Sequence, residues 1–78
     1  MEKQKAEALA KIKNEEIKGK YMIKVDGSSE IRNVIEVMSN YYEDNKNNWD
    51  VWVVFENDDF GLPQRVLLNY FETNYKKI

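Results

Sequence analysis

Neither cysteine nor histidine occurs among the 78 residues of this chain. The chain therefore has to fold without a disulfide or a Cys/His metal site, the usual supports of domains this small. The same absence removes the thiol nucleophile and the imidazole acid or base. Because a core of this size stabilises a fold only marginally, dimerisation or partner binding is expected. We expect one small domain over residues 1–78 that is not an enzyme and holds no cofactor and no metal ion.

Charge is segregated along the sequence. Residues 1–20 carry six lysines against four glutamates, whereas residues 21–75 carry ten acids against four bases. An excess of negative charge repels phosphate backbones and attracts basic surfaces. The pattern therefore predicts a basic protein surface as the partner and argues against nucleic acid.

The sequence carries no strong targeting or nucleotide-binding signal. No apolar run reaches the roughly 18 residues of a membrane-spanning helix, and no apolar signal core follows Met1. The three glycines are isolated, which argues against a phosphate-binding loop. We therefore expect a cytoplasmic protein that does not associate with a membrane.

The first 19 residues predict a helix. Residues 2–18 are rich in Lys, Glu, Gln, Ala and Leu, which favour helix, and contain neither Gly nor Pro. Gly19 follows at a position where helices often end. The apolar face is thin and consists of Ala8, Leu9, Ile12 and Ile17. We therefore expect residues 1–19 to form a weakly anchored N-terminal helix.

A strand and a second helix are predicted next. Residues 21–25 alternate in the manner of a short strand, and Asp26-Gly27 predicts a turn. Ser28 or Ser29 then offers an N-cap for a helix. Apolar residues recur at helical spacing over 31–42, at Ile31, Val34, Ile35, Met38, Tyr41 and Tyr42. This stripe predicts a helix that would connect two parallel strands by a right-handed crossover.

The C-terminal half is predicted to contain a strand and one ambiguous segment. Residues 43–48 have the composition of a polar loop, and residues 49–56 are the strongest strand signal, apolar on both faces. The segment 63–78 has an apolar stripe at helical spacing, so we expect a helix there. A strand over 65–71, paired in a hairpin with residues 49–56, is the alternative.

Together these segments predict an α+β fold. The expected order of elements is α-β-α-β-α, and the alternative, with the last segment as a third strand, is α-β-α-β-β.

Acidic residues flank both ends of the predicted strand over 49–56, and an exposed Trp52 would lie between them. Carboxylates around an exposed aromatic ring suit an interface with a basic target. The candidate partner-binding residues are Glu43, Asp44, Asp50, Trp52, Glu56, Asp58 and Asp59.

These observations predict a small, acidic, non-catalytic protein-binding module. It would be of an inhibitor or immunity type, such as phages and mobile elements carry, or would mimic a nucleic-acid backbone. One alternative is a dimeric regulatory module that contacts DNA through the lysines of residues 1–20. A second alternative is a structural subunit whose strand edges pair with neighbouring subunits.

Overall fold

The computed structural model describes residues 1–57 and 62–78, in which two helices combine with an antiparallel sheet, as expected of an α+β fold. Its five strands form one sheet in the order β4-β3-β2-β1-β5, and all neighbouring strands are antiparallel. The predicted parallel crossover is therefore wrong. The elements are α1 (Lys3–Ile17), β1 (Tyr21–Lys24), β2 (Ile31–Tyr42), β3 (Asn45–Asn57), β4 (Leu62–Leu67), α2 (Leu68–Asn74) and β5 (Tyr75–Lys77).

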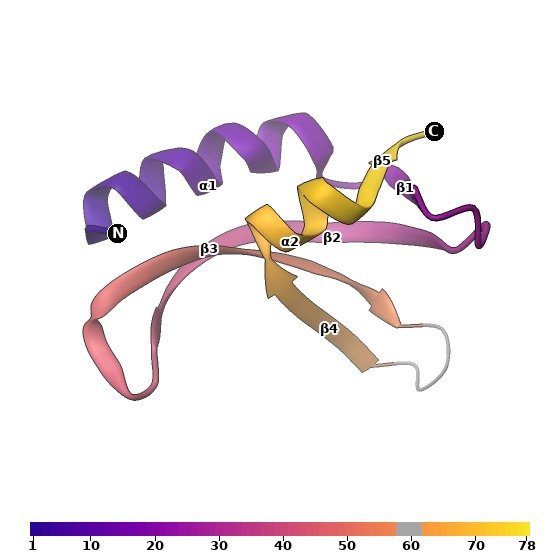
Figure 1. Cartoon of the computed structure of the whole chain (residues 1–78). Helices are drawn as coiled ribbons and strands as arrows, with labels where there is room; N and C mark the ends of the chain where they lie inside the picture. Colours follow the sequence, from indigo (N-terminus) through magenta and orange to yellow (C-terminus); the bar gives the residue numbers. More distant parts are fainter. Residues whose placement is uncertain (58–61) are drawn as a thin grey trace.

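Both helices lie on the same face of the sheet (Figure 1). Helix α1 contacts β2 and β3, and α2 contacts β3 and β4. The core lies between the helices and the sheet, where Val34, Val51, Val53 and Phe71 are fully buried. The opposite face of the sheet is covered by no helix of the described part of the chain, so its side chains are available for contacts.

Helix α1 and the turn after β1 follow the sequence prediction. The helix ends before Gly19, whose φ of +75° lies in the left-handed region. Its buried face differs from the predicted one, because Ala6, Ala10 and Ile17 are buried while Ile12 is 54% exposed. Alanines bury little apolar area but allow a close approach to the sheet. The weak anchoring of α1 stays a prediction.

The helix predicted over residues 31–42 is wrong, since this segment is the long strand β2. Ser28 and Ser29 accordingly lie in the turn between β1 and β2 and cap no helix. The register shifts between Val34 and Glu36, which marks a β-bulge. A bulge changes the parity of the strand, so Val34 and Val37 both reach the core. The predicted stripe instead takes apolar residues from both faces of the strand, since Val34 is buried in the core and Met38 pairs with Trp52 on the other side.

The end of the chain combines both interpretations of residues 63–78. Strand β4 pairs with β3 in a hairpin, as the alternative proposed, and the chain then turns into the short helix α2 and strand β5. Leu68, Phe71 and Tyr75 are buried, whereas Tyr70 is 55% exposed. The single long helix is therefore wrong, and the last element is a strand.

The loop predicted over residues 43–48 is also shorter than expected. Only Glu43 and Asp44 form the turn, and β3 begins at Asn45. As a result, the ends of β2 and β3 near this turn extend as a two-stranded ribbon beyond β1 and β4. Within residues 1–57 and 62–78, each strand of the ribbon has one outer edge that no neighbouring strand covers.

Side chains occupy much of these outer edges. The Oδ1 atoms of Asn14, Asn40, Asn45 and Asp50 accept the backbone N–H groups of Val37, Tyr41, Asn47 and Val51 at 2.8–3.1 Å. Backbone atoms of Met1 exchange two hydrogen bonds with Trp49. These contacts take up donors that would otherwise attract a further strand.

Removing the side-chain amide of Asn14 is expected to destabilise the fold. Asn14→Ala leaves the part-buried N–H of Val37 without its acceptor at 2.8 Å, and an unsatisfied donor costs about 1–3 kcal/mol. Alanine's higher helix propensity offsets about 0.5 kcal/mol of this loss. Urea denaturation measures the change. Asn14→Asp keeps an acceptor oxygen and should lose much less, and equal losses in both variants would contradict the role of this hydrogen bond.

Candidate protein-binding face

The side of the sheet away from the helices gathers aromatic, aliphatic and charged side chains. Val51, Val53 and Phe55 of β3 point into the core, so the alternate residues of β3 point to the other side. Their cross-strand partners on β2 and β4 share that side. With Tyr42, whose hydroxyl donates a hydrogen bond to Asp50, they form what we call the open face: Glu36, Met38, Asn40, Tyr42, Asp50, Trp52, Val54, Glu56, Pro63, Arg65 and Leu67.

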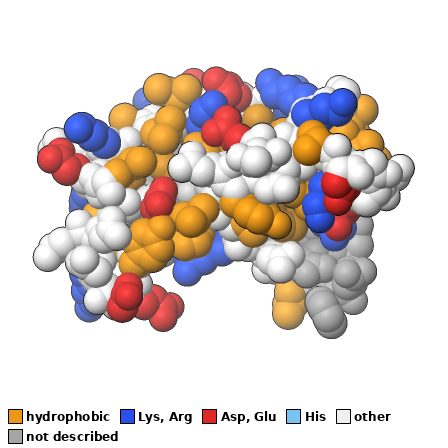
Figure 2. Space-filling model, in the orientation of Figure 1, with side chains coloured by type: hydrophobic (Ala, Val, Ile, Leu, Met, Phe, Trp, Pro, Cys, Tyr) orange, Lys and Arg blue, Asp and Glu red, His pale blue; other side chains and the backbone are white. Residues whose placement is uncertain are grey.

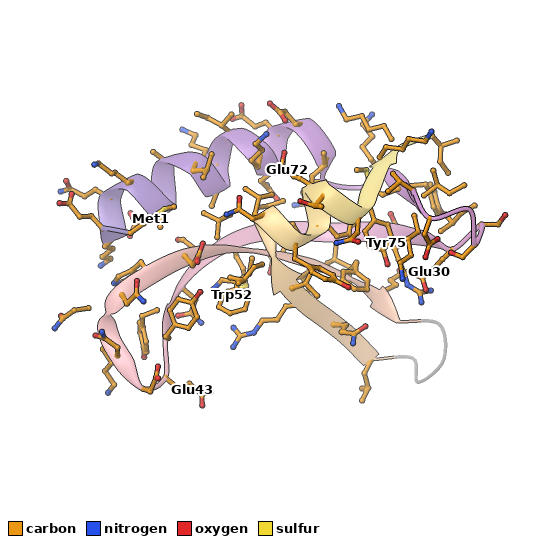
Figure 3. All side chains as sticks on the ribbon, viewed as in Figure 1. Met1, Glu30, Glu43, Trp52, Glu72 and Tyr75 are labelled. Carbon is orange, nitrogen blue, oxygen red and sulfur yellow. The ribbon has the colours of Figure 1, made fainter. Side chains whose placement is uncertain are left out.

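Trp52 lies at the centre of the open face. Figure 3 shows its side chain on the side of β3 away from α1 and α2. The ring of Tyr42 lies 5.5 Å from it between centroids, and the guanidinium carbon of Arg65 lies 4.7 Å from the ring centroid. Within the described residues, the buried indole nitrogen of Trp52 has no hydrogen-bond acceptor. Because that nitrogen is buried, only the partly exposed ring of Trp52 is open to contact, and large aromatic rings are common anchors of protein interfaces.

Asp50 holds this aromatic centre in place. Its Oδ2 accepts a hydrogen bond from the Tyr42 hydroxyl at 2.8 Å, and its Oδ1 accepts one from the Val51 backbone N–H. The hydrogen bond to Asp50 raises the pKa of the Tyr42 hydroxyl, because the neutral phenol is the donor. Both carboxylate oxygens thus have partners within the fold. Asp50 positions Tyr42 next to Trp52, a role that the sequence did not indicate.

The remaining predicted acids lie at two places. Glu43 and Asp44 form the exposed turn at the tip of the β2–β3 ribbon, and Glu56 is exposed at the other end of the open face. Asp58 and Asp59 lie outside the described residues. In residues 1–57 and 62–78, the ion pairs involve other acids, namely Glu7, Glu16, Asp26, Glu30 and Glu72. The structure thus brings Asp50, Trp52 and Glu56 onto one face and leaves Glu43 and Asp44 at its end.

Two charged residues of the open face were missed by the sequence prediction. Glu36 is paired with Val54 across β2 and β3, and Arg65 is paired with the same Val54 across β3 and β4. A helix over 31–42 would have placed Glu36 on an unrelated surface. Val37 is apolar but does not belong to the helical stripe, and it is buried in the structure. An apolar residue outside the stripe is the signal that could have identified a strand.

Charges of both signs are spread over the visible side of the molecule. Figure 2 shows acidic side chains at the lower left, where Figure 3 labels Glu43, with basic ones close by, and further basic side chains at the upper right. The molecule extends 37 Å along its longest axis. At a Debye length of about 8 Å in physiological salt, two ends so far apart are screened from each other.

Comparisons with known proteins return no match. No family model matches the chain, and no curated protein or solved structure matches it. Neither of the two described helices has the length and apolar character needed to cross a membrane.

Proposed function

We propose that this protein is a non-catalytic binding module that docks the open face on a basic protein surface. The observation that carries the proposal is Trp52 packed between Tyr42 and Arg65, with Glu36 and Glu56 exposed on the same face. Interfaces commonly combine a central aromatic anchor with a charged rim. The acidic rim selects a basic partner and accelerates its association.

The proposed biological role is inhibition or immunity, as a phage or mobile element would encode, in the cytoplasm of the host. A small protein can block a basic target by covering the surface on which that target binds nucleic acid. The acidic groups of the open face and of the ribbon tip would then replace phosphates. This role needs no catalytic group, in keeping with the side chains that the sequence provides.

Charge reversal on the open face tests the proposal. Wild-type protein and the double variant Glu36→Lys/Glu56→Lys are immobilised and exposed to a cell extract of the native host. We expect the wild type to retain a basic protein that elutes with salt, and the variant to lose it. Association of that protein with the variant should be at least about tenfold slower and less dependent on ionic strength.

A matched control separates surface charge from stability. Glu2→Lys/Glu15→Lys makes the same change in charge at two exposed positions away from the open face, the N-cap of α1 and a residue within that helix. This control should retain the partner. Trp52→Ala should lose it without any change in net charge. The proposal would be contradicted if both charge-reversal variants retained the same proteins. It would also be contradicted if the wild type retained only acidic proteins.

The two alternative functions have weaker support. In α1, Lys13 is paired with Glu16 and Glu72, and Lys3 is paired with Glu7, so part of the basic surface is neutralised. A gel shift with and without residues 1–20 tests DNA binding. The structural-subunit alternative needs free strand edges. The outer edge β4 contains Pro63, and the other outer edge, β5, is only three residues long and carries two lysines, features that hinder edge pairing.

A further inference from the structure

Arg65 lies over the ring of Trp52 on the open face. Its guanidinium carbon lies 4.7 Å from the centroid of the indole ring, a distance at which a cation is attracted to the face of an aromatic ring. The strand register explains this contact, because Trp52 pairs with Leu67 and Val54 pairs with Arg65, which makes Arg65 and Trp52 diagonal neighbours. Since Arg65 is itself exposed, another cation can reach the ring if this side chain moves aside.

Glu36 supplies a carboxylate near the same ring. It pairs with Val54 from the β2 side, as Arg65 does from the β4 side, so Glu36 is also a diagonal neighbour of Trp52. Diagonal neighbours lie about 7–8 Å apart, within reach of a long side chain. Glu36 is exposed, and the ion pairs within residues 1–57 and 62–78 do not include it. A cation that stacks on Trp52 can therefore pair with this carboxylate.

We propose that the open face recognises an arginine side chain of its partner, which stacks on Trp52 in place of Arg65 and pairs with Glu36. This inference rests on the proposed function and specifies the group that the basic partner inserts. The exchange puts one guanidinium in the place of another and adds the carboxylate of Glu36, with which Arg65 forms no ion pair in the structure. Arginine suits the position better than lysine, because its planar and weakly hydrated group stacks on aromatic rings and can bind a carboxylate through two hydrogen bonds.

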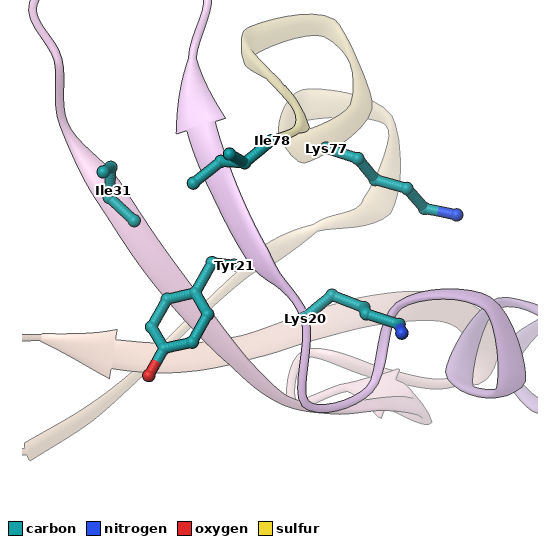
Figure 4. Close-up of a pocket in the computed structure, with 5 residues that line it drawn as sticks. All are labelled: Lys20, Tyr21, Ile31, Lys77 and Ile78. Carbon is teal, nitrogen blue, oxygen red and sulfur yellow. The ribbon is translucent and has the colours of Figure 1, made fainter.

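Tyr21 is an exposed aromatic residue that lacks these features and serves as a reference. It is 59% exposed and lines a hollow of about 670 Å³ at the β1–β5 end of the sheet, together with Lys20, Ile31, Lys77 and Ile78. Figure 4 shows the side chains of both lysines extending away from the Tyr21 ring, and the described residues that line the hollow include no acid. We therefore expect no arginine to stack on Tyr21.

An NMR titration with a capped tri-arginine peptide tests this proposal. We expect saturable shifts of the indole N–H of Trp52 and of the backbone amides of Val54 and Arg65, and no shift of the amide of Tyr21. Tri-lysine, which has the same charge without the planar group, should bind more weakly. Tri-citrulline, which has a planar group without the charge, should cause no saturable shift at these residues.

Substitutions separate the roles of Arg65 and Glu36. Arg65→Gln removes the competing cation and should tighten tri-arginine binding about two- to fivefold, the value of one cation–π contact at an exposed site. Lys11→Gln removes the same charge from an exposed position on α1, on the other side of the sheet, and should leave the affinity unchanged. Glu36→Gln removes the carboxylate and should weaken binding about two- to fivefold.

Several outcomes would overturn the proposal. An unchanged or weaker affinity in Arg65→Gln would do so, as would equal binding of tri-arginine and tri-lysine. Shifts at Trp52 that grow with protein concentration alone and vanish in Arg65→Gln would make a second copy of the chain the occupant, which also overturns it. Retention of a basic protein by the open face without any tri-arginine shift would overturn this inference and leave the proposed function standing. Tri-arginine binding without any retained basic protein would contradict the proposed function instead.

Discussion

Replacing Phe71 by alanine is expected to lower the free energy of unfolding by about 3–5 kcal/mol, the usual cost of deleting a buried phenylalanine ring. Phe71 is fully buried and joins α2 to the sheet. Its ring stacks on Tyr75 with centroids 4.5 Å apart and lies 5.8 Å from that of Phe55. Small domains have a total stability of about 5–15 kcal/mol, so this variant would be close to unfolding at room temperature.

Tyr70→Ala is the matched control for this result. Tyr70 precedes Phe71 in the same helix, but its side chain is exposed. Its replacement should change stability by less than about 0.5 kcal/mol. Urea unfolding followed by tryptophan fluorescence measures both variants. A loss below about 1 kcal/mol for Phe71→Ala would show that α2 is not docked on the sheet as described.

Alkaline pH is expected to destabilise the fold through Tyr75. Burial, followed by the hydrogen bond that its hydroxyl donates to Glu30, raises the pKa of Tyr75 from 10 to about 12. A group whose pKa is higher in the folded state than in the unfolded state contributes its full stabilisation below the unfolded-state pKa, here pH 10. The stabilisation is lost as the pH rises from 10 to 12, because only the unfolded chain then loses this proton readily. The loss amounts to about 2–3 kcal/mol at pH 12.

Tyr75→Phe separates this effect from the titration of other groups. The variant keeps the ring that stacks on Phe71 but has no proton to lose. Between pH 10 and 12, the free energy of unfolding of the variant should fall by about 2–3 kcal/mol less than that of the wild type. Urea unfolding at intervals of half a pH unit over this range measures the difference. Parallel pH profiles for the two proteins would contradict a raised pKa at Tyr75.

The sequence predicts the regular parts of this fold well. Residues 3–17 form a helix because strong helix formers are uninterrupted there, and residues 49–56 form a strand because β-branched and aromatic residues are concentrated. The strand β2 could not be predicted from periodicity. Its bulge and its two apolar faces imitate a helical pattern, and only tertiary packing decides between them. The same packing converts residues 62–67 to a strand, because β3 provides a partner.

The candidate site was predictable only in its composition. The acids and the tryptophan were identified from the sequence, but their arrangement depends on strand register. Register pairs Asn40 with Asp50 and Met38 with Trp52, which places Tyr42 within reach of both β3 residues. It also adds Glu36 and Arg65 to the open face, two residues that no local pattern associates with Trp52. Long-range pairing of this kind is not visible in a linear sequence.

The hydrogen bonds along the outer edges of the β2–β3 ribbon have a consequence for the behaviour of many copies in one solution. A ribbon with free N–H groups on both sides would recruit the same segment of another molecule, and the process would continue into a fibril. Asn14, Asn40, Asn45 and Asp50 supply acceptors from within the molecule instead. We therefore expect the protein to resist strand-to-strand association at high concentration although it exposes an aromatic surface.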